Sequence, residues 1–161
     1  MQYHPLVTYP NPILRKKANL VGEITPEIEE LISHMKTVMQ QHNGIGLAAP
    51  QVGAPLQLFI VQEEDEVRAF LNPQILSSSK EQETDTEGCL SIPKLWVEVS
   101  RPHAITVSCL TPKGKEISLS LEGFSARVFQ HEIDHLNGIL IINRIPFWKR
   151  WKALRKYKSS S

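Results

Sequence analysis

Apolar residues recur every three or four positions along residues 28–39, the spacing that places them on one face of an α-helix. Thr25 and Pro26 precede this stripe and are typical of a helix N-cap and of the first helical position. Asn43-Gly44 follows it, and both residues tolerate the left-handed backbone that ends helices. The predicted core-facing stripe consists of Ile28, Leu31, Ile32, Met35, Val38 and Met39.

Four short runs rich in branched and aromatic residues predict β-strands. The runs are residues 56–61, 67–71, 104–110 and 116–121. Hairpin turns are expected at 62–66 and 111–115, which implies antiparallel pairing. Residues 44–55 are rich in Gly, Ala and Pro, and residues 77–86 are polar and acidic, so both segments are expected to be loops.

The C-terminal part predicts a second helix over residues 125–136, which Asn137-Gly138 would end. Residues 139–142 predict a short strand, and the remaining tail predicts a final helix. Helices that are segregated from antiparallel strands favour the α+β class.

Composition is that of one ordinary globular domain, with 161 residues of which 41% are hydrophobic and 22% charged. The net charge is +1, but six basic and no acidic residues lie between positions 149 and 158. The rest of the chain holds 12 basic and 17 acidic residues. We therefore divide this single domain into a body, residues 1–146, and a basic C-terminal helix or tail, residues 147–161.

Several classes of protein are disfavoured by the same composition. Charges or prolines interrupt every apolar run before the ~20 residues that a membrane span needs. The first five residues have neither the basic cap nor the apolar core of a secretory signal. Two cysteines are too few for a disulfide framework. A cytoplasmic protein with free thiols and no membrane partner is expected.

The strongest chemical signal is the segment His131-Glu132-Ile133-Asp134-His135. Histidines four residues apart on a helix lie on the same face, so both imidazoles reach one ion. Glu132 is placed to accept a proton from water bound to that ion. A catalytic site needs a third protein ligand and an open position. No His, Asp, Glu or Cys follows His135, so the third ligand is expected upstream.

Two cysteines, four further histidines and the carboxylates are candidates for that third ligand. Cys89 follows a glycine that lets the backbone turn, so its thiolate can point inward. Cys109 lies in an apolar alternation, where the expected role is that of a small buried hydrophobe. Surface or turn positions suffice for His4, His34, His42 and His103. Cys89 with His131 and His135 is therefore the favoured set.

Three segments, taken together and in this order, resemble the signatures of the peptide deformylase family. They are Gly44-Ile45-Gly46-Leu47-Ala48-Ala49-Pro50-Gln51, Glu87-Gly88-Cys89-Leu90-Ser91 and Gln130-His131-Glu132-Ile133-Asp134-His135. The similarity extends from about Pro10 through Arg144, and the continuation of the second segment into Ile92-Pro93 is similar to the bacterial type. The fold that this resemblance implies has antiparallel sheets packed around a central helix carrying HEIDH, with a C-terminal helix.

The resemblance implies a hydrolase that removes the N-formyl group from formyl-methionine at the start of newly synthesised polypeptides, releasing formate. It implies that Cys89, His131 and His135 hold one metal ion and that Glu132 is the acid/base. Thiolate and imidazole ligands suit several metals. The resemblance implies Fe²⁺ natively, with Zn²⁺, Ni²⁺ or Co²⁺ able to occupy the same site.

The remaining site residues come from the same resemblance. The Gln51 side-chain amide and the Leu90 backbone N–H are implied as donors to the oxyanion. Gly46 allows close approach of an extended peptide. The implied methionine pocket is lined by Ile45, Phe124 and Val128.

Further expectations concern partners and supporting contacts. The resemblance implies N-formylmethionyl peptides as substrates and ribosome contact through the basic C-terminal helix, in which Trp148, Trp151 and Leu154 are expected to dock on the body. Glu87 and Arg101 are expected to form an ion pair that braces the cysteine loop. The segment Lys94-Leu95-Trp96 does not map onto the family pattern, which leaves open how residues beyond methionine are contacted.

Two other functions fit part of the pattern. A zinc endopeptidase would share the HExxH segment, but its third ligand usually follows that segment. A binding protein with a closed structural metal site would need a fourth protein ligand and would leave Glu132 without a role.

Overall fold

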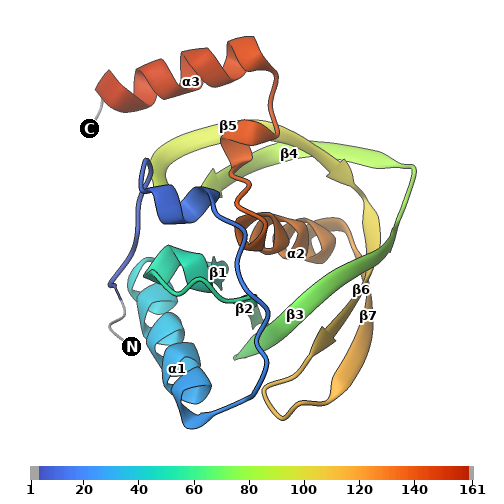
Figure 1. Cartoon of the computed structure of the whole chain (residues 1–161). Coiled ribbons are helices and arrows are strands. Elements are labelled where there is room, and N and C mark those ends of the chain that lie inside the picture. Colours follow the sequence, from blue (N-terminus) through green and yellow to red (C-terminus); the bar gives the residue numbers. More distant parts are fainter. Residues whose placement is uncertain (1–3, 160–161) are drawn as a thin grey trace.

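The computed structural model, which describes residues 4–159, contains two antiparallel sheets and three α-helices in that part of the chain (Figure 1). The larger sheet has five strands in the order β1-β2-β3-β6-β7. Its strands are β1 (Gly46–Ala48), β2 (Leu58–Glu63), β3 (Glu66–Ser78), β6 (Ala104–Leu110) and β7 (Glu116–Glu122). The pairing is antiparallel throughout, which confirms the two predicted hairpins.

Alternation along β2 divides the interior into two cores. Leu58 and Ile60 face α1 (Pro26–Gln41), whose predicted apolar stripe is buried against them. Phe59 and Val61 face α2 (Gly123–Leu136) on the other side of the sheet. Successive strand residues point to opposite faces, so one short apolar strand joins both helices to the sheet.

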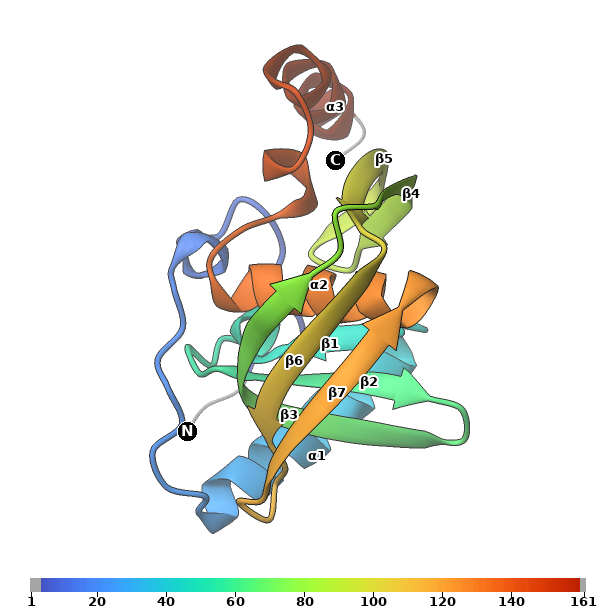
Figure 2. The ribbon, with the colours of Figure 1, turned by 90° about the vertical axis from the view of Figure 1, so that its right-hand side faces the viewer.

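The smaller sheet pairs β4 (Gln82–Cys89) with β5 (Ile92–Pro102). Its register places Gly88 opposite Trp96 and then shifts, so that Cys89 lies opposite Ile92. The shift leaves residues 93–95 of β5 as a bulge. Both views place this sheet between α2 and α3 (Phe147–Ser159) (Figures 1 and 2).

Local sequence explains where α2 begins and ends. Gly123 adopts a positive φ of 56°, which turns the chain out of β7 directly into the helix. Asn137 is the C-cap, and Gly138 follows with a φ of 72°, as the Asn-Gly pair predicted. The helix starts two residues before the predicted position. The α+β architecture around a central helix, with a C-terminal helix, is confirmed.

Three local predictions were wrong. Residues 44–55 are not a continuous loop, because β1 pairs with β2 and is followed by a 3-10 turn, Ala49–Val52. Residues 77–86 are not a loop, because β3 extends to Ser78 and β4 begins at Gln82. Most of these side chains are exposed and polar, so backbone pairing with β5 stabilises the strand without an apolar alternation. Residues 139–142 do not form a strand. They enter a 3-10 turn, Ile141–Asn143, and the Asn143 side chain accepts a hydrogen bond from the Leu140 amide at 2.9 Å.

Helix α3 lies where the tail prediction placed a helix, but its docked face differs from the predicted one. Trp148 and Trp151 are 68% and 58% exposed. Leu154 docks as predicted, and Ala153 and Tyr157 pack with it against a third core formed by the N-terminal segment, β5 and residues 140–145. Residues three apart advance about 300° on a helix, so the predicted run drifts off one face. Within residues 4–159, no helix is long and apolar enough to span a membrane.

Candidate metal centre

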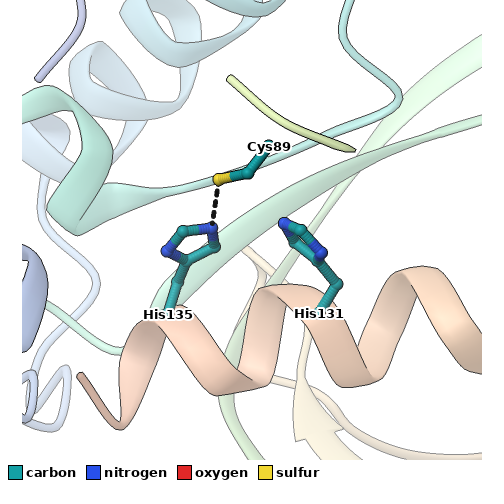
Figure 3. Close-up of side chains that lie close together, drawn as sticks. All are labelled: Cys89, His131 and His135. Atoms are coloured by element: carbon teal, nitrogen blue, oxygen red, sulfur yellow. Dashed lines mark hydrogen bonds between the residues drawn. The ribbon is translucent and has the colours of Figure 1, made fainter. Parts of the chain in front are cut away.

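The end of β4 faces two successive turns of α2. Cys89 reaches this point from β4, while His131 and His135 project from α2 toward it (Figure 3). One ligand atom from each residue lies within 4.8 Å of the other two. The Sγ of Cys89 is 3.3 Å from Nε2 of His135. The sequence-predicted ligands therefore meet in space, although they come from two separate elements.

The surroundings of these three side chains fit a cation. Burial lowers the pKa of His135 well below its usual range, so its ring stays neutral and a nitrogen lone pair is available. Burial would also lower the pKa of His131, but interactions with Cys89 and Glu87 outweigh it and raise that pKa. The anionic groups that favour a proton on His131 also favour a metal cation beside it. One thiolate and two imidazoles form a donor set that zinc and ferrous iron both accept.

Glu87 orients His131 from behind. Its Oε2 lies 3.0 Å from Nδ1 of His131, which leaves Nε2 to face Cys89. Arg101 donates two hydrogen bonds to Glu87, at 2.6 and 2.9 Å, and Arg127 donates another at 2.8 Å. Burial opposes ionisation of Glu87, but the contacts with His131 and Arg101 lower its pKa well below the usual range. The predicted Glu87–Arg101 pair is thus confirmed as a contact.

The same ion-pair network extends to Asp134, inside the HEIDH segment. Arg101 donates to Asp134 Oδ2 at 2.8 Å, and Arg144 donates to both carboxylate oxygens. Asp134 points away from the ligand cluster and ties the C-terminal turn of α2 to the chain that leads to α3. Its partners satisfy a carboxylate that would otherwise be costly to bury.

Glu132 lies at the floor of the site and is 4% exposed. Burial raises its pKa to about 7. Its Oε2 has no hydrogen-bond partner among the described residues. A Cβ atom on Gly46 would collide with Oε1 of Glu132, so the glycine in β1 is required for this carboxylate to approach the strand. A buried carboxyl with an unused oxygen is suited to proton transfer.

Gln51 is held in one orientation by its neighbours. Its Oε1 accepts a hydrogen bond from the Ala48 amide at 2.8 Å. Its Nε2 donates to Ser91 Oγ at 3.0 Å and lies 4.0 Å from Cys89 Sγ. Ser91 donates in turn to the Val7 carbonyl at 2.8 Å. One amide hydrogen of Gln51 is therefore anchored, and the amide group lies beside the ligand cluster.

A cavity of about 580 Å³ opens onto this cluster. It is lined by the four residues predicted to bind substrate, Ile45, Gly46, Phe124 and Val128. It is also lined by Gln51, Leu90, His131 and Glu132. The structure thus brings the predicted acid/base, the predicted oxyanion donors and the predicted apolar pocket to one cavity.

Other candidate ligands lie elsewhere in the fold. Cys109 is buried on β6, where burial raises the pKa of its thiol to about 11. His103 pairs with Glu83 at 2.9 Å, and His34 contacts the His4 carbonyl at 2.9 Å. His42 lines the cavity but does not belong to the ligand group.

Sequence reasoning missed four supporting residues: Ser91, Arg127, Asp134 and Arg144. A signal was present for two of them. Arg127 and Asp134 are charged residues within a helix whose stripe had to be buried, and a buried charge requires a partner. Ser91 and Arg144 carried no comparable signal, since their partners come from distant segments.

Comparisons with known proteins agree with this geometry. The profile of the family described as "Polypeptide deformylase" matches residues 3–151. The chain is 45% identical over 146 residues to a peptide deformylase of Treponema pallidum subsp. pallidum, and the match spans 91% of this chain and 90% of that protein. The structure resembles the peptide deformylase of Thermus thermophilus, with a TM-score of 0.90, 40% identity and coverage of 97% and 93%. It also resembles a peptide deformylase from Synechococcus elongatus in complex with actinonin, with a TM-score of 0.90, 37% identity and coverage of 95% and 85%.

Proposed function

The chain belongs to the polypeptide deformylase family, and from this membership we propose which of its residues carry each part of the reaction. The protein is a hydrolase that removes the N-formyl group from formyl-methionine at the N-terminus of newly synthesised polypeptides, releasing formate. The family is metal-dependent, and this chain has a matching group of potential ligands.

Cys89, His131 and His135 are the proposed ligands of one ion per chain. We assign Fe²⁺ as the native ion and Zn²⁺, Ni²⁺ or Co²⁺ as ions able to occupy the same ligands. When bound, the ion supplies Lewis-acid chemistry, because it acidifies water and polarises a carbonyl oxygen. The ion pair between Glu87 and Arg101 keeps His131 oriented for this role.

Glu132 is the proposed acid/base. The carboxylate accepts a proton as water attacks the formyl carbon, and it then delivers that proton to the departing amine. Its burial supports this assignment, because a raised pKa of about 7 balances proton acceptance against proton donation near neutral pH.

Gln51 and Leu90 are the proposed donors to the developing oxyanion, through the side-chain amide and the backbone N–H respectively. Hydrogen bonds to Ala48 and Ser91 support this role, because they fix the Gln51 amide before substrate arrives. Ile45, Phe124 and Val128 are the proposed walls of the methionine pocket. The backbone of Gly46 is proposed to form main-chain hydrogen bonds with an extended substrate.

One observation supports this assignment most directly: Glu132 lines the cavity beside the three proposed ligands, and within residues 4–159 its buried Oε2 has no hydrogen-bond partner. Formate release from formyl-Met-Ala-Ser under anaerobic conditions with Fe²⁺, with a metal assay on the same sample, tests it. Unformylated Met-Ala-Ser serves as the control substrate. Cleavage of its peptide bonds would favour the endopeptidase, and a metal-replete protein without any turnover would favour a structural site.

We further propose that the enzyme acts in the cytoplasm and contacts the ribosome through the outer face of α3. Arg155 and Lys158 are exposed on this outer face, with Arg155 over the Trp151 ring at 5.3 Å, and Arg150 is half-buried near the start of the helix. Phosphate contacts release counterions, so binding should weaken steeply with salt. Replacing Arg150, Arg155 and Lys158 with Gln should reduce co-sedimentation with ribosomes at low salt and leave tripeptide deformylation unchanged. Undiminished co-sedimentation would contradict the contact.

A further inference from the structure

A second cavity, of about 650 Å³, lies between α3 and the N-terminal part of β5. We call it the α3 groove. Leu95, Ile145, Ala153 and Tyr157 give it an apolar floor. Three lysines of α3, Lys149, Lys152 and Lys156, line one side. Their spacing of three and four residues places all three on the same helix face. The groove therefore has an apolar base and a cationic wall.

The α3 groove adjoins the catalytic cavity, with which it shares part of its lining. Both are lined by Pro93, Lys94, Leu95 and Trp96, the part of β5 that contains the bulge. Leu95 is buried and anchors the bulge, whereas Trp96 is 69% exposed. The Trp96 ring lies against Gly88, where any Cβ would collide with it. A chain that leaves the catalytic cavity over the bulge would thus pass along the exposed Trp96 indole into the groove.

Charge in the groove selects the kind of chain that fits. Its wall holds four lysines, including Lys94, and one carboxylate, Glu98. Lys149 lies 3.8 Å from Glu98, and both side chains are more than half exposed. Such an exposed pair contributes little to stability, so a carboxylate of a bound peptide can replace Glu98 beside Lys149. Acidic side chains next to an apolar residue complement this surface.

We propose that the α3 groove binds an acidic stretch of the substrate polypeptide downstream of its formyl-methionine. This inference rests on the proposed function, because the occupant is the same chain whose N-terminus enters the catalytic cavity. The proposal assigns a role to the segment Lys94-Leu95-Trp96, which the family pattern did not explain. This segment would form the surface over which the substrate passes from one binding site to the other. Formyl-methionine is recognised at one end, and acidity further along the chain adds affinity.

Synthetic peptides test the proposal directly. Formyl-Met peptides of about 12 residues extend to roughly 40 Å, enough to pass the bulge. One series carries a block of Glu residues at successive distances from formyl-Met, and a matched series carries Lys in its place. The purified, metal-loaded enzyme should show a higher kcat/KM for the Glu peptides at one block position, by roughly fivefold at low ionic strength. Added salt should reduce the preference.

Matched variants separate the groove from general electrostatics. Lys149→Gln, Lys152→Gln and Lys156→Gln together should abolish the preference for Glu peptides. Arg150→Gln, Arg155→Gln and Lys158→Gln remove the same charge from α3 residues that do not line the groove, and they should preserve it. Glu98→Gln removes the competing carboxylate and should strengthen the preference.

The outcomes are distinct. Equal kcat/KM for the Glu and Lys peptides, or equal loss in both triple variants, would overturn the proposal. It would also be overturned if the variant lacking Lys149, Lys152 and Lys156 kept the preference for Glu peptides and lost ribosome co-sedimentation. The groove lysines would then bind RNA instead of the substrate. Formyl-Met-Ala-Ser is too short to reach the groove, so its turnover tests the proposed function alone. No turnover of the tripeptide would count against the proposed function. Normal tripeptide turnover without a preference for Glu peptides would count only against the groove.

Discussion

Oε2 of Glu87 lies 3.0 Å from Nδ1 of His131, and this contact joins the metal centre to a buried ion-pair network. The carboxylate stays ionised because His131 and Arg101 lower its pKa despite burial. An ionised Glu87 accepts a hydrogen bond from Nδ1–H of His131, which leaves Nε2 facing Cys89. The orientation of His131, a proposed ligand, thus depends on a residue two positions before Cys89, the proposed ligand cysteine.

Glu87→Gln should weaken metal binding, because a neutral amide holds the His131 ring less firmly and does not balance Arg101. The expected loss in metal affinity or activity is about 10–100-fold. Competition with a chelator, followed by a metal assay, measures it. Glu63→Gln is a matched control, because Glu63 pairs with Arg68 at 2.6 Å on the surface. Equal metal retention by both variants would remove the bracing role.

Arg101→Leu should destabilise the fold as well as the site. The substitution leaves Glu87 and Asp134 buried with one cationic partner fewer. Removal of one member of a buried ion pair typically costs about 3–5 kcal/mol in the free energy of unfolding. Chemical denaturation of the metal-loaded protein measures the change. The double variant Glu87→Gln with Arg101→Leu should lose less stability than the single effects combined, since the uncompensated carboxylate is gone.

Cys89→Ala should lose tightly bound metal and activity together, because the thiolate is one of three proposed ligands. Cys109→Ala should keep both, at a cost of about 1 kcal/mol in stability, since Cys109 is a buried side chain on β6. Metal content after gel filtration and formate release measure the two properties. An active, metal-replete Cys89→Ala protein would contradict the ligand set.

Glu132→Ala should retain about one ion per chain and lose formate release by roughly 10²–10⁴-fold, the usual contribution of a positioned acid/base. The carboxylate is proposed to move protons and not to bind the ion. Metal content and single-turnover formate release, measured on the same sample, separate these roles. Loss of the ion from the variant would show that the carboxylate had been assigned the wrong role.

The sequence predicted the parts of the site that depend on local geometry. His131 and His135 share one face of α2 because helical spacing dictates it, whatever the rest of the chain does. The contact between Glu87 and Arg101 was also predictable, because each charge lies close to the cysteine segment. The family resemblance then indicated Gln51 and Leu90, which no local period could reveal.

The rest of the site depends on pairing between segments that are distant in the sequence. Cys89 was predicted in a turn, whereas it ends β4, a strand whose exposed polar residues gave no alternation. The bulge at residues 93–95 follows from the register shift beside Cys89, and register is set by the paired strands together. Arg144 reaches Asp134 only because the chain folds back after α2. These contacts are properties of the tertiary fold.

Gly46→Ala should displace the Glu132 carboxylate, since the new methyl group would collide with Oε1. A misplacement of about 1 Å at a catalytic group costs roughly 10²-fold in rate, so kcat should fall by about that factor. Metal content should stay near one ion per chain, because Gly46 is not one of the three proposed ligands. Gly22→Ala is the control, since a Cβ at Gly22 meets no atom within 4 Å. Steady-state kinetics with formyl-Met-Ala-Ser distinguishes two roles for this glycine. A rise in KM with kcat unchanged would mean that Gly46 serves only the approach of substrate and that Glu132 tolerates the methyl group.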